Sequence, residues 1–563
     1  MVPRSRLLNC QKYLTKRFNR STQAYFGNLP PQLRKYYLDY QRDFRKYEKI
    51  IHKSELLSEV EKSQIILCGD YHSLSQAQRT LIRILREIIP KLKKEKKPIY
   101  LAMEIFKAKH NLRIQQYLRS EITEEEFLRA VSFGDWGFSW GNYAPLLRLA
   151  KEFRIPVVGL SPSQPSSLAD RDVFAAKVIA HWAQKEPSGV VFCLMGDLHL
   201  AKHHLPHALK LEMETRELSK KLLVIHQNHE WLYWKMVKKK MEHQAEVVKL
   251  KKGVFCVLNT PPWLKLQSHL KWVEVLSSSE GVERKMLWRE QLAELGEPLD
   301  HTQEIMDVIE AMKKFLGLKE SFEEDYRNLE VFGPHDFGFL QKMVKTGDYQ
   351  PQEIRILSRG LKEFQSQFFY RGQKFYLGNL KINHVASLSA QFIHSKLSGF
   401  RGVFEVPSRD FYAFVWVEAL GFFGSKIINP KRKCHGSLDF EAAFHAPEKH
   451  LSATSKALQL AHTHVLAERN YFRKRGTPPL PYFLKWANPS LVDVILIHKV
   501  AKLLGKLLGE GIYSLFLQKE LPPAVLMKLF STNFEQGAQE LYLKWAQKLD
   551  KEHQRTFSFK DKL

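Results

Sequence analysis

The sequence has no run of about 18 consecutive apolar residues, which a membrane-spanning helix would need. Its basic start also lacks the apolar segment of about 7–15 residues that a secretory signal peptide contains. We therefore expect a bacterial-like protein of the cytoplasm, with association with the cell envelope as the alternative.

Cysteine is scarce, and the CxxC pairs typical of zinc sites are absent. The five cysteines lie far apart along the chain, and three of them lie inside apolar runs. This distribution is typical of small buried side chains in a reducing compartment. The sequence therefore predicts neither a disulfide framework nor a zinc knuckle.

Acidic residues are in deficit, since 60 Asp and Glu stand against 87 Lys and Arg, and the formal net charge is +27. This charge suits an anionic partner such as nucleic acid, a phospholipid surface or the propionates of haem. Helix-turn-helix, RNP and zinc-finger patterns are missing, however, and the lysines gather in runs typical of a solvated surface. The sequence therefore argues against a nucleic-acid partner, while peripheral membrane contact and a homo-oligomer stay open.

The length of 563 residues, with 44% hydrophobic and 26% charged residues, indicates a folded globular protein of two to four domains. We expect a basic helical segment over 1–60, with a helix at Tyr36–Lys49. An α/β domain over 61–275 follows, then a linker and connecting helix over 276–324. A mostly α-helical domain is expected over 325–563.

The α/β domain is predicted from short apolar runs separated by longer amphipathic stretches. The runs are 65–68, 99–103, 156–160, 190–195, 222–225 and 254–258, and helical spacing is kept over 75–89, 123–131, 143–153 and 172–184. Continuous apolar strands joined by helices predict a parallel sheet covered by helices on both faces.

Polar residues follow these runs, at the sheet edge where open parallel sheets bind ligands. Two runs end in the same G-D-x-H tetrapeptide, Gly69–His72 and Gly196–His199, and a third ends in Glu104. His226 and His229 follow another run and are equally well explained as surface histidines. A His/Glu/Asp cluster can bind a divalent metal, supply a general base with an orienting carboxylate, or hold haem iron, and the spacing leaves these alternatives open.

Several motifs agree in order and spacing with one known family. They are Gly69-Asp70-Tyr71-His72, Ala102-Met103-Glu104-Ile105-Phe106, Trp136 and Trp140 with Tyr143-Ala144-Pro145, Ile155–Leu160, and Gly196-Asp197-Leu198-His199. On these motifs residues 62–265 resemble the ChaN-like domain. That domain is the haem-binding uptake group of the superfamily that also contains the Tiki and TraB proteins and the erythromycin esterases.

The resemblance implies a polar pocket at the sheet edge and haem binding in iron acquisition, or hydrolysis as in the esterase and Tiki relatives. Carried over by position, His72, Glu104 and His199 are expected as the catalytic or metal-ligating residues. The ligand-binding residues expected around them are Asp70, Tyr71, Asp197, Trp136 and Tyr143.

The C-terminal half gives weaker signals. His464 and Glu468 share one helix face, as metal ligands do, yet a solvated pair is favoured. The amphipathic stretch Leu491–Leu508 has the pattern of a helix on an anionic membrane, but Gly505 and Gly509 favour a core helix because they permit close packing.

The function that we expect is binding of haem or a related anionic ligand in the pocket, in iron or haem handling, with haem or a divalent metal as cofactor. A metal-dependent or His-base hydrolase is the first alternative. The second alternative is an interaction protein in which the pocket is vestigial.

Overall fold

The computed structural model describes residues 3–26, 29–164, 166–278, 302–319, 338–347, 349–379, 381–402, 407–446, 452–474 and 491–563, with short stretches at 322, 325–326, 328–333, 336 and 478–479. The chain divides into two compact units. The α/β unit contains Thr15–Glu297 with Lys562 and Leu563, and the helical unit contains Met1–Leu14 with Pro298–Asp561. Residues 279–301 of the expected linker lie outside the described ranges.

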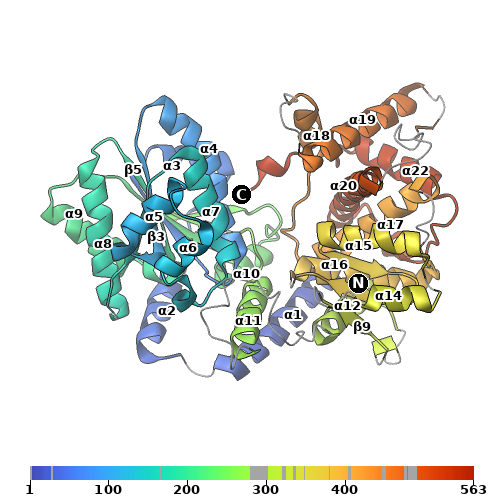
Figure 1. Ribbon diagram of the computed structural model, residues 1–563, viewed down its shortest axis with the longest axis horizontal. Helices are drawn as coiled ribbons and strands as arrows, with labels where there is room; N and C mark the ends of the chain where they lie inside the picture. Colours follow the sequence, from blue (N-terminus) through green and yellow to red (C-terminus); the bar gives the residue numbers. More distant parts are fainter. Residues whose placement is uncertain are drawn as a thin grey trace. The chain divides into compact units, whose positions relative to one another are not determined.

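An eight-stranded sheet with the strand order β1-β7-β8-β6-β2-β5-β3-β4 forms the α/β unit. Its strands β3 and β5 are labelled in Figure 1, with helices around them. The strands are β1 (Lys49–Ile51), β2 (Ile65–Asp70), β3 (Ile99–Lys107), β4 (Val157–Ser161), β5 (Val190–Gly196), β6 (Leu222–Gln227), β7 (Val247–Lys251) and β8 (Val254–Val257). The strands that contain the six predicted runs pair in parallel, which confirms the α/β fold class. The unpredicted β1 and β7 pair antiparallel at one edge, where exposed positions interrupt the apolar pattern.

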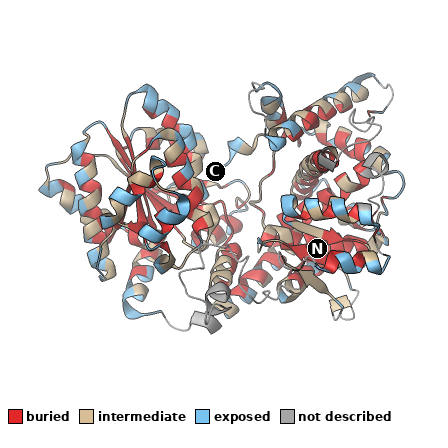
Figure 2. Ribbon diagram, viewed as in Figure 1, coloured by how far each residue is buried: buried red, intermediate tan, exposed pale blue. Residues whose placement is uncertain are grey.

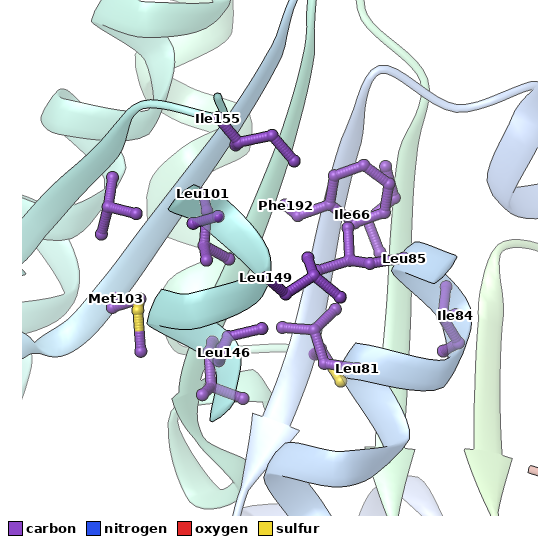
Figure 3. Packing of buried hydrophobic residues seen from close by; sticks show 14 of the residues in the cluster. Ile66, Leu81, Ile84, Leu85, Leu101, Met103, Leu146, Leu149, Ile155 and Phe192 are labelled. Atoms are coloured by element: carbon purple, nitrogen blue, oxygen red, sulfur yellow. The ribbon is translucent and has the colours of Figure 1, made fainter. Parts of the chain in front are cut away.

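Helices cover both faces of this sheet, and Figure 2 shows the buried strands between them. One face carries α3 (Lys53–Glu61), α4 (Ser75–Lys94), α5 (Asn111–Leu118), α6 (Glu124–Ala130) and α7 (Trp140–Phe153), and the other carries α8 (Leu168–Lys185) and α9 (Leu205–Thr215). Leu81, Ile84 and Leu85 of α4 lie on one helix face and pack with Leu146 and Leu149 of α7 (Figure 3). This packing fixes the central strands whose carboxyl ends carry the site.

The helix expected over Tyr36–Lys49 begins and ends earlier in the chain than predicted. It is α2 (Pro31–Asp43), and Lys49 already begins β1. The chain leaves the helix at Phe44, which is completely buried with Tyr40 in a cluster beside α10 (Glu230–Lys238). Lys49 then pairs with Lys249 at the sheet edge. Burial of Phe44 and strand pairing therefore override the helical spacing.

The helical unit confirms the mostly α-helical prediction for the C-terminal half. Its helices include α12 (Thr302–Leu316), α14 (Gly338–Lys345), α15 (Pro351–Phe364), α16 (Ile382–Ser398), α17 (Pro407–Ile428), α18 (Ser437–Phe444), α19 (Ala453–Lys474), α20 (Leu491–Leu517), α21 (Pro523–Phe530) and α22 (Ala538–Lys551). A small sheet of β9 (Glu330–Phe332), β10 (Ser366–Phe369) and β11 (Lys374–Leu377) was not expected. Its strands are only three or four residues long, too short to show an alternating pattern.

The centre of this unit is the pair α17 and α20. Within the described part of the chain, α17 is the one helix long and apolar enough to cross a membrane, and 94% of its stretch Phe411–Ile428 is buried inside the protein. A core helix passes the same test of length and composition. A Cβ on Gly505 of α20 would lie 2.6 Å from Val415 O, so the two helices touch through backbone. Lys499 of α20 lies 2.6 Å from Glu363, and these contacts identify α20 as a core helix.

The solvated His464–Glu468 pair favoured by the sequence is wrong, because the structure buries both side chains. Glu468 Oε1 lies 2.9 Å from His464 Nε2 and accepts a hydrogen bond of 2.6 Å from Tyr542. Its Oε2 accepts a hydrogen bond of 2.8 Å from Arg555, which also donates to Asp550. Helical spacing alone could not place Asp550 of α22, or Arg555 after it, beside α19.

This buried ion pair gives a stability prediction for Glu468→Gln. We expect a loss of about 3 kcal/mol in the free energy of unfolding, because the buried Arg555 would keep Asp550 but lose the charge of Glu468, its fully buried partner. Burial raises the pKa of Glu468, but Arg555 and His464 outweigh it and lower the pKa to about 2. The difference in free energy of unfolding between the parent and Glu468→Gln should therefore be largest above pH 4.5, the ordinary pKa of a glutamate. It should shrink as the pH falls toward 2.

Urea unfolding of both proteins near neutral pH and in acid measures this difference. The exposed Glu552→Gln is the matched control and should unfold like the parent protein. Equal midpoints for the parent and Glu468→Gln near neutral pH would contradict the prediction.

Candidate functional site

Side chains from β3 and from two strand ends meet beside Gly196. Because β2 and β5 pair in parallel, Asp70 lies opposite Gly196 in register. A Cβ placed on Gly196 would meet Glu104 Oε2 at 3.3 Å, His199 Cδ2 at 3.4 Å and His72 Nε2 at 3.5 Å. The structure therefore brings together the three residues expected to be catalytic or metal-ligating.

The imidazole of His72 is held from behind by Asp70. His72 Nδ1 lies 2.8 Å from Asp70 Oδ2, and the hydroxyl of Tyr143 donates to the same oxygen at 3.0 Å. Gln78 of α4 donates to the other oxygen of Asp70. Asp70 is buried, whereas the side chain of His72 is 23% exposed. His72 is thus fixed in orientation but open on one side.

The second G-D-x-H tetrapeptide does not repeat this arrangement. His199 Nδ1 lies 2.6 Å from Asp172 Oδ1 of α8, and not beside Asp197 of its own motif. The hydroxyl of Tyr36 of α2 donates to Asp172 Oδ2 at 2.6 Å. The side chain of His199 is 8% exposed, so this imidazole lies deeper than His72.

Glu104 lies between the two imidazoles. Its oxygens are 3.9 Å from His72 Nε2 and 3.8 Å from His199 Nε2, which is too long for hydrogen bonds. Instead, Glu104 Oε2 accepts a bond of 2.6 Å from the Gly196 N–H, and Oε1 accepts one from Arg171. Burial raises the pKa of Glu104, but the histidines and Arg171 outweigh it, so the pKa is lowered and Glu104 is ionised.

The cluster has an excess of carboxylates. Asp70, Glu104 and Asp172 stand against the single guanidinium of Arg171, so with neutral imidazoles the formal charge is −2. Burial lowers the pKa of His72, but Asp70 and Glu104 outweigh it, and the pKa lies above its ordinary value. The site therefore attracts protons or another cationic centre.

An aromatic wall faces His72. The ring of Trp136 lies 4.9 Å from the imidazole and that of Phe138 lies 5.0 Å from it. Phe138 in turn stacks on Trp272 of α11 (Pro262–Ser278) at 4.6 Å and 15°. Trp272 Nε1 donates to Gly137 O at 2.7 Å, which fixes this wall. A flat apolar ligand would find ring faces and edges beside the accessible imidazole.

Tyr71 contacts a different set of residues from its neighbour His72. Its hydroxyl lies 3.1 Å from His269 Nδ1, and Lys265 Nζ lies 4.6 Å from its ring centroid. Burial raises the pKa of Tyr71, so its hydroxyl stays protonated. Burial lowers the pKa of Lys265, although Asp197 acts in the opposite direction.

Asp197 belongs to a neighbouring buried network and does not contact the cluster around Glu104. Asp197 Oδ1 lies 3.0 Å from His226 Nδ1, and Tyr40 donates to Oδ2. A Cβ on Gly69 would lie 2.0 Å from Asp197 Oδ1, so this glycine makes room for the carboxylate. His226 and His229 are both buried, which excludes the surface interpretation. Burial lowers the pKa of His229 to about 3.

The sequence reasoning missed Arg171, Asp172 and Tyr36. Ser167 and Asp170 form a capping box that begins α8 directly after β4, at the same sheet edge as the other strand ends. Arg171 and Asp172 lie in the first turns of this helix, so their charged side chains could have been predicted to reach the site. Tyr36 lies on a helix far away in sequence, and no local pattern assigns its contact to Asp172.

Among the residues that the structure describes, no group of three or more His, Cys, Asp or Glu side chains has the arrangement of a metal site. At this site Arg171 donates to one oxygen of Glu104, and the Gly196 N–H donates to the other. As placed, His72, Glu104 and His199 do not present a metal-ligand set, and the divalent metal expected from the sequence gains no support.

Comparison with known proteins gives one family match. Residues 56–168 match the family described as "Haem-binding uptake, Tiki superfamily, ChaN", which confirms the resemblance for this part of the chain. A solved structure described as "Cofacial heme binding to ChaN of Campylobacter jejuni" is similar at 16% identity and a TM-score of 0.27, over 32% of this chain and 88% of that chain. Comparison with curated proteins gives no match.

The contacts of Asp70 predict the effect of Asp70→Asn on the acidity of its neighbour. This change should lower the pKa of His72, because it removes the negative charge 2.8 Å from Nδ1. The imidazole resonances followed by NMR against pH report the pKa directly. Asp172→Asn is the matched control, since Asp172 contacts His199 and should leave the pKa of His72 near its parent value. An unchanged His72 titration in Asp70→Asn would contradict this assignment.

Proposed function

We propose that the site beside Gly196 binds haem, and that His72 would hold it with Glu104 nearby. The observation that carries the proposal is the pair of imidazoles whose Nδ1 atoms are held by aspartates. Their Nε2 atoms both lie beside Glu104, at 3.9 Å for His72 and 3.8 Å for His199, without a hydrogen bond to it. Bound haem would supply an iron centre, and an imidazole nitrogen of His72 would hold it.

The residues present fit such a ligand in three respects. His72 is the more exposed imidazole, and Asp70 fixes the tautomer that leaves Nε2 available. The wall of Trp136 and Phe138 suits a flat macrocycle. The carboxylate excess around Glu104 suits a cationic iron centre, while Arg171, whose side chain is 26% exposed, is a cation beside it for a propionate of haem. A role in handling haem or its iron follows as part of this proposal.

A haem titration of the full-length protein, followed by absorbance, tests the proposal. We expect a saturable shift of the Soret band and at least a tenfold weaker affinity in His72→Ala. His199→Ala should also weaken binding, though less, because this residue is more deeply buried. The exposed His203→Ala is the matched control and should bind like the parent. No shift, or equal affinity in all four proteins, would overturn the proposal.

The pH dependence of this affinity has a defined sign. An imidazole must lose its proton before its Nε2 can bind iron. Because the pKa of His72 is raised, haem affinity should increase as the pH rises through that pKa. Asp70→Asn should move this increase to lower pH. An affinity that falls over the same range would contradict His72 as the ligand.

A hydrolase with a histidine base is the second candidate, favoured by the Asp70–His72 contact. In this function His72 would take a proton from water, and Asp70 would orient the ring and stabilise its charged form. Turnover of a generic ester that is lost in His72→Ala and kept in His203→Ala would support the hydrolase. Turnover kept in a His72→Ala, His199→Ala double variant would rule out this mechanism.

A further inference from the structure

A cavity in the helical unit has no part in the proposed function. It lies between α15, α17 and α20, and its wall is completed by α16, β10 and the residues that follow them. The space that atoms leave unfilled measures about 660 Å³, counting its opening to solvent. Small-molecule sites in proteins measure about 300–1,000 Å³, so the cavity has the size of such a site.

Four aromatic side chains line this cavity. They are Phe364, Tyr370, Phe400 and Phe414. Tyr370 contributes its ring to the wall, because its hydroxyl lies 3.4 Å from His394 Nδ1. Aromatic rings pack well against other flat rings, so the wall favours an aromatic ligand.

Two amide side chains in the wall are already engaged with the backbone. Gln391 Nε2 donates to Val417 O at 3.5 Å, and Gln367 Nε2 donates to Phe368 O at 3.0 Å. The charged and imidazole side chains of the wall are Glu418 of α17 with His498 and Lys502 of α20. His498 and Lys502 lie one helical turn apart, on the same face of α20. The polar groups that a ligand can use are thus gathered on one wall.

Lys502 is a hydrogen-bond donor on this wall. It donates to Glu418, and its Nζ lies 4.8 Å from the ring centroid of Phe364. An ammonium group has three N–H bonds, so Lys502 can donate to a ligand oxygen while it keeps Glu418. The ring of His498 lies 4.8 Å from that of Phe414. Burial lowers the pKa of His498 to about 4, so its imidazole is neutral near pH 7.

The charges that line the cavity cancel. Burial raises the pKa of Glu418, but Lys502 and Lys506 outweigh it, so the pKa is lowered and Glu418 is ionised. Its charge balances that of Lys502, and no other Asp, Glu, Lys or Arg is among the described residues that line the cavity. A charged ligand would therefore lose water without gaining a counter-ion of its own. This balance favours an uncharged ligand whose oxygen accepts from Lys502.

Gly360 keeps one side of the cavity open. It lies inside α15, where a glycine weakens a helix. Close contact with a neighbour would explain a glycine, but the nearest described atom to a Cβ built there is Phe364 Cδ2, at 3.7 Å. That distance is an ordinary van der Waals contact, so a methyl group would fit. A larger side chain would enter the cavity that Gly360 lines.

We propose that this cavity binds a small uncharged aromatic molecule with a carbonyl or hydroxyl oxygen that accepts a hydrogen bond from Lys502. The aromatic wall would hold the ring, and the balanced pair of Lys502 and Glu418 would receive the oxygen. The cavity belongs to the helical unit, so this inference does not depend on haem binding beside Gly196.

Calorimetric titration of the full-length protein with acetophenone, a single ring with one carbonyl oxygen, tests the proposal. We expect saturable binding that becomes at least tenfold weaker in Gly360→Leu, because the added side chain occupies the cavity. Gly360→Ala is the matched control, since it makes the same backbone change with only a methyl group. It should bind acetophenone like the parent protein.

The charge of the ligand gives a second test. Benzoate has nearly the shape of acetophenone but carries a negative charge. We expect the parent to bind benzoate at least tenfold more weakly than acetophenone, because Glu418 lies beside Lys502. Glu418→Gln should reduce this difference, since it frees the ammonium group of Lys502 for the carboxylate of benzoate. Benzoate that binds the parent as tightly as acetophenone would contradict an uncharged ligand.

Thermal unfolding without ligand shows whether the variants keep the fold. Gly360→Leu and Gly360→Ala should unfold at or above the temperature of the parent, because both replace a glycine inside a helix. Loss of acetophenone binding in Gly360→Leu, with binding kept in Gly360→Ala, supports the site. No saturable binding to the parent, or equal binding to the parent and a folded Gly360→Leu, would overturn the proposal.

Discussion

The arrangement of the candidate site beside Gly196 depends on keeping the buried carboxylate of Glu104 charged. Glu104 loses water on folding, and the Gly196 N–H and Arg171 replace that water at its two oxygens. Glu104 does not hydrogen-bond the imidazoles beside it, because their Nε2 atoms lie 3.9 and 3.8 Å away. His72 and His199 are held instead by aspartates at Nδ1, and this leaves both Nε2 atoms on the side of Glu104. A ligand would therefore meet groups that are already oriented.

The parallel sheet could be predicted because strands buried on both faces appear as continuous apolar runs. The edge strand β1 could not, since it has only three residues, and β7 mixes buried and exposed positions. The bounds of α17 could not be predicted within the expected helical region, because a helix buried on nearly all sides has no polar face to reveal its period. Likewise, the burial of Glu468 depends on Arg555, which is 87 residues away in sequence.

The site was partly predictable for a related reason. His72, Glu104 and His199 follow or end buried strands, so the topology alone brings them to one edge. The repeated G-D-x-H tetrapeptide was misleading about Asp197, because the two copies have different neighbours. Asp70 faces its own histidine, whereas Asp197 faces His226 of β6. The shared pattern gives neither the same backbone nor the same contacts, since the second copy continues into a 3-10 helix at Asp197–Leu200 and the contacts come from adjacent elements.

Local charge balance differs between the two units and is not visible in the overall charge of +27. Around Glu104 three carboxylates face one guanidinium, whereas the cavity of the helical unit is lined by one cation and one carboxylate. Around Glu104 the excess of carboxylate charge lies in a place with little water, where such charge is costly. A ligand that stabilises this group must therefore bring a positive centre to it. The iron of the proposed haem would meet this requirement.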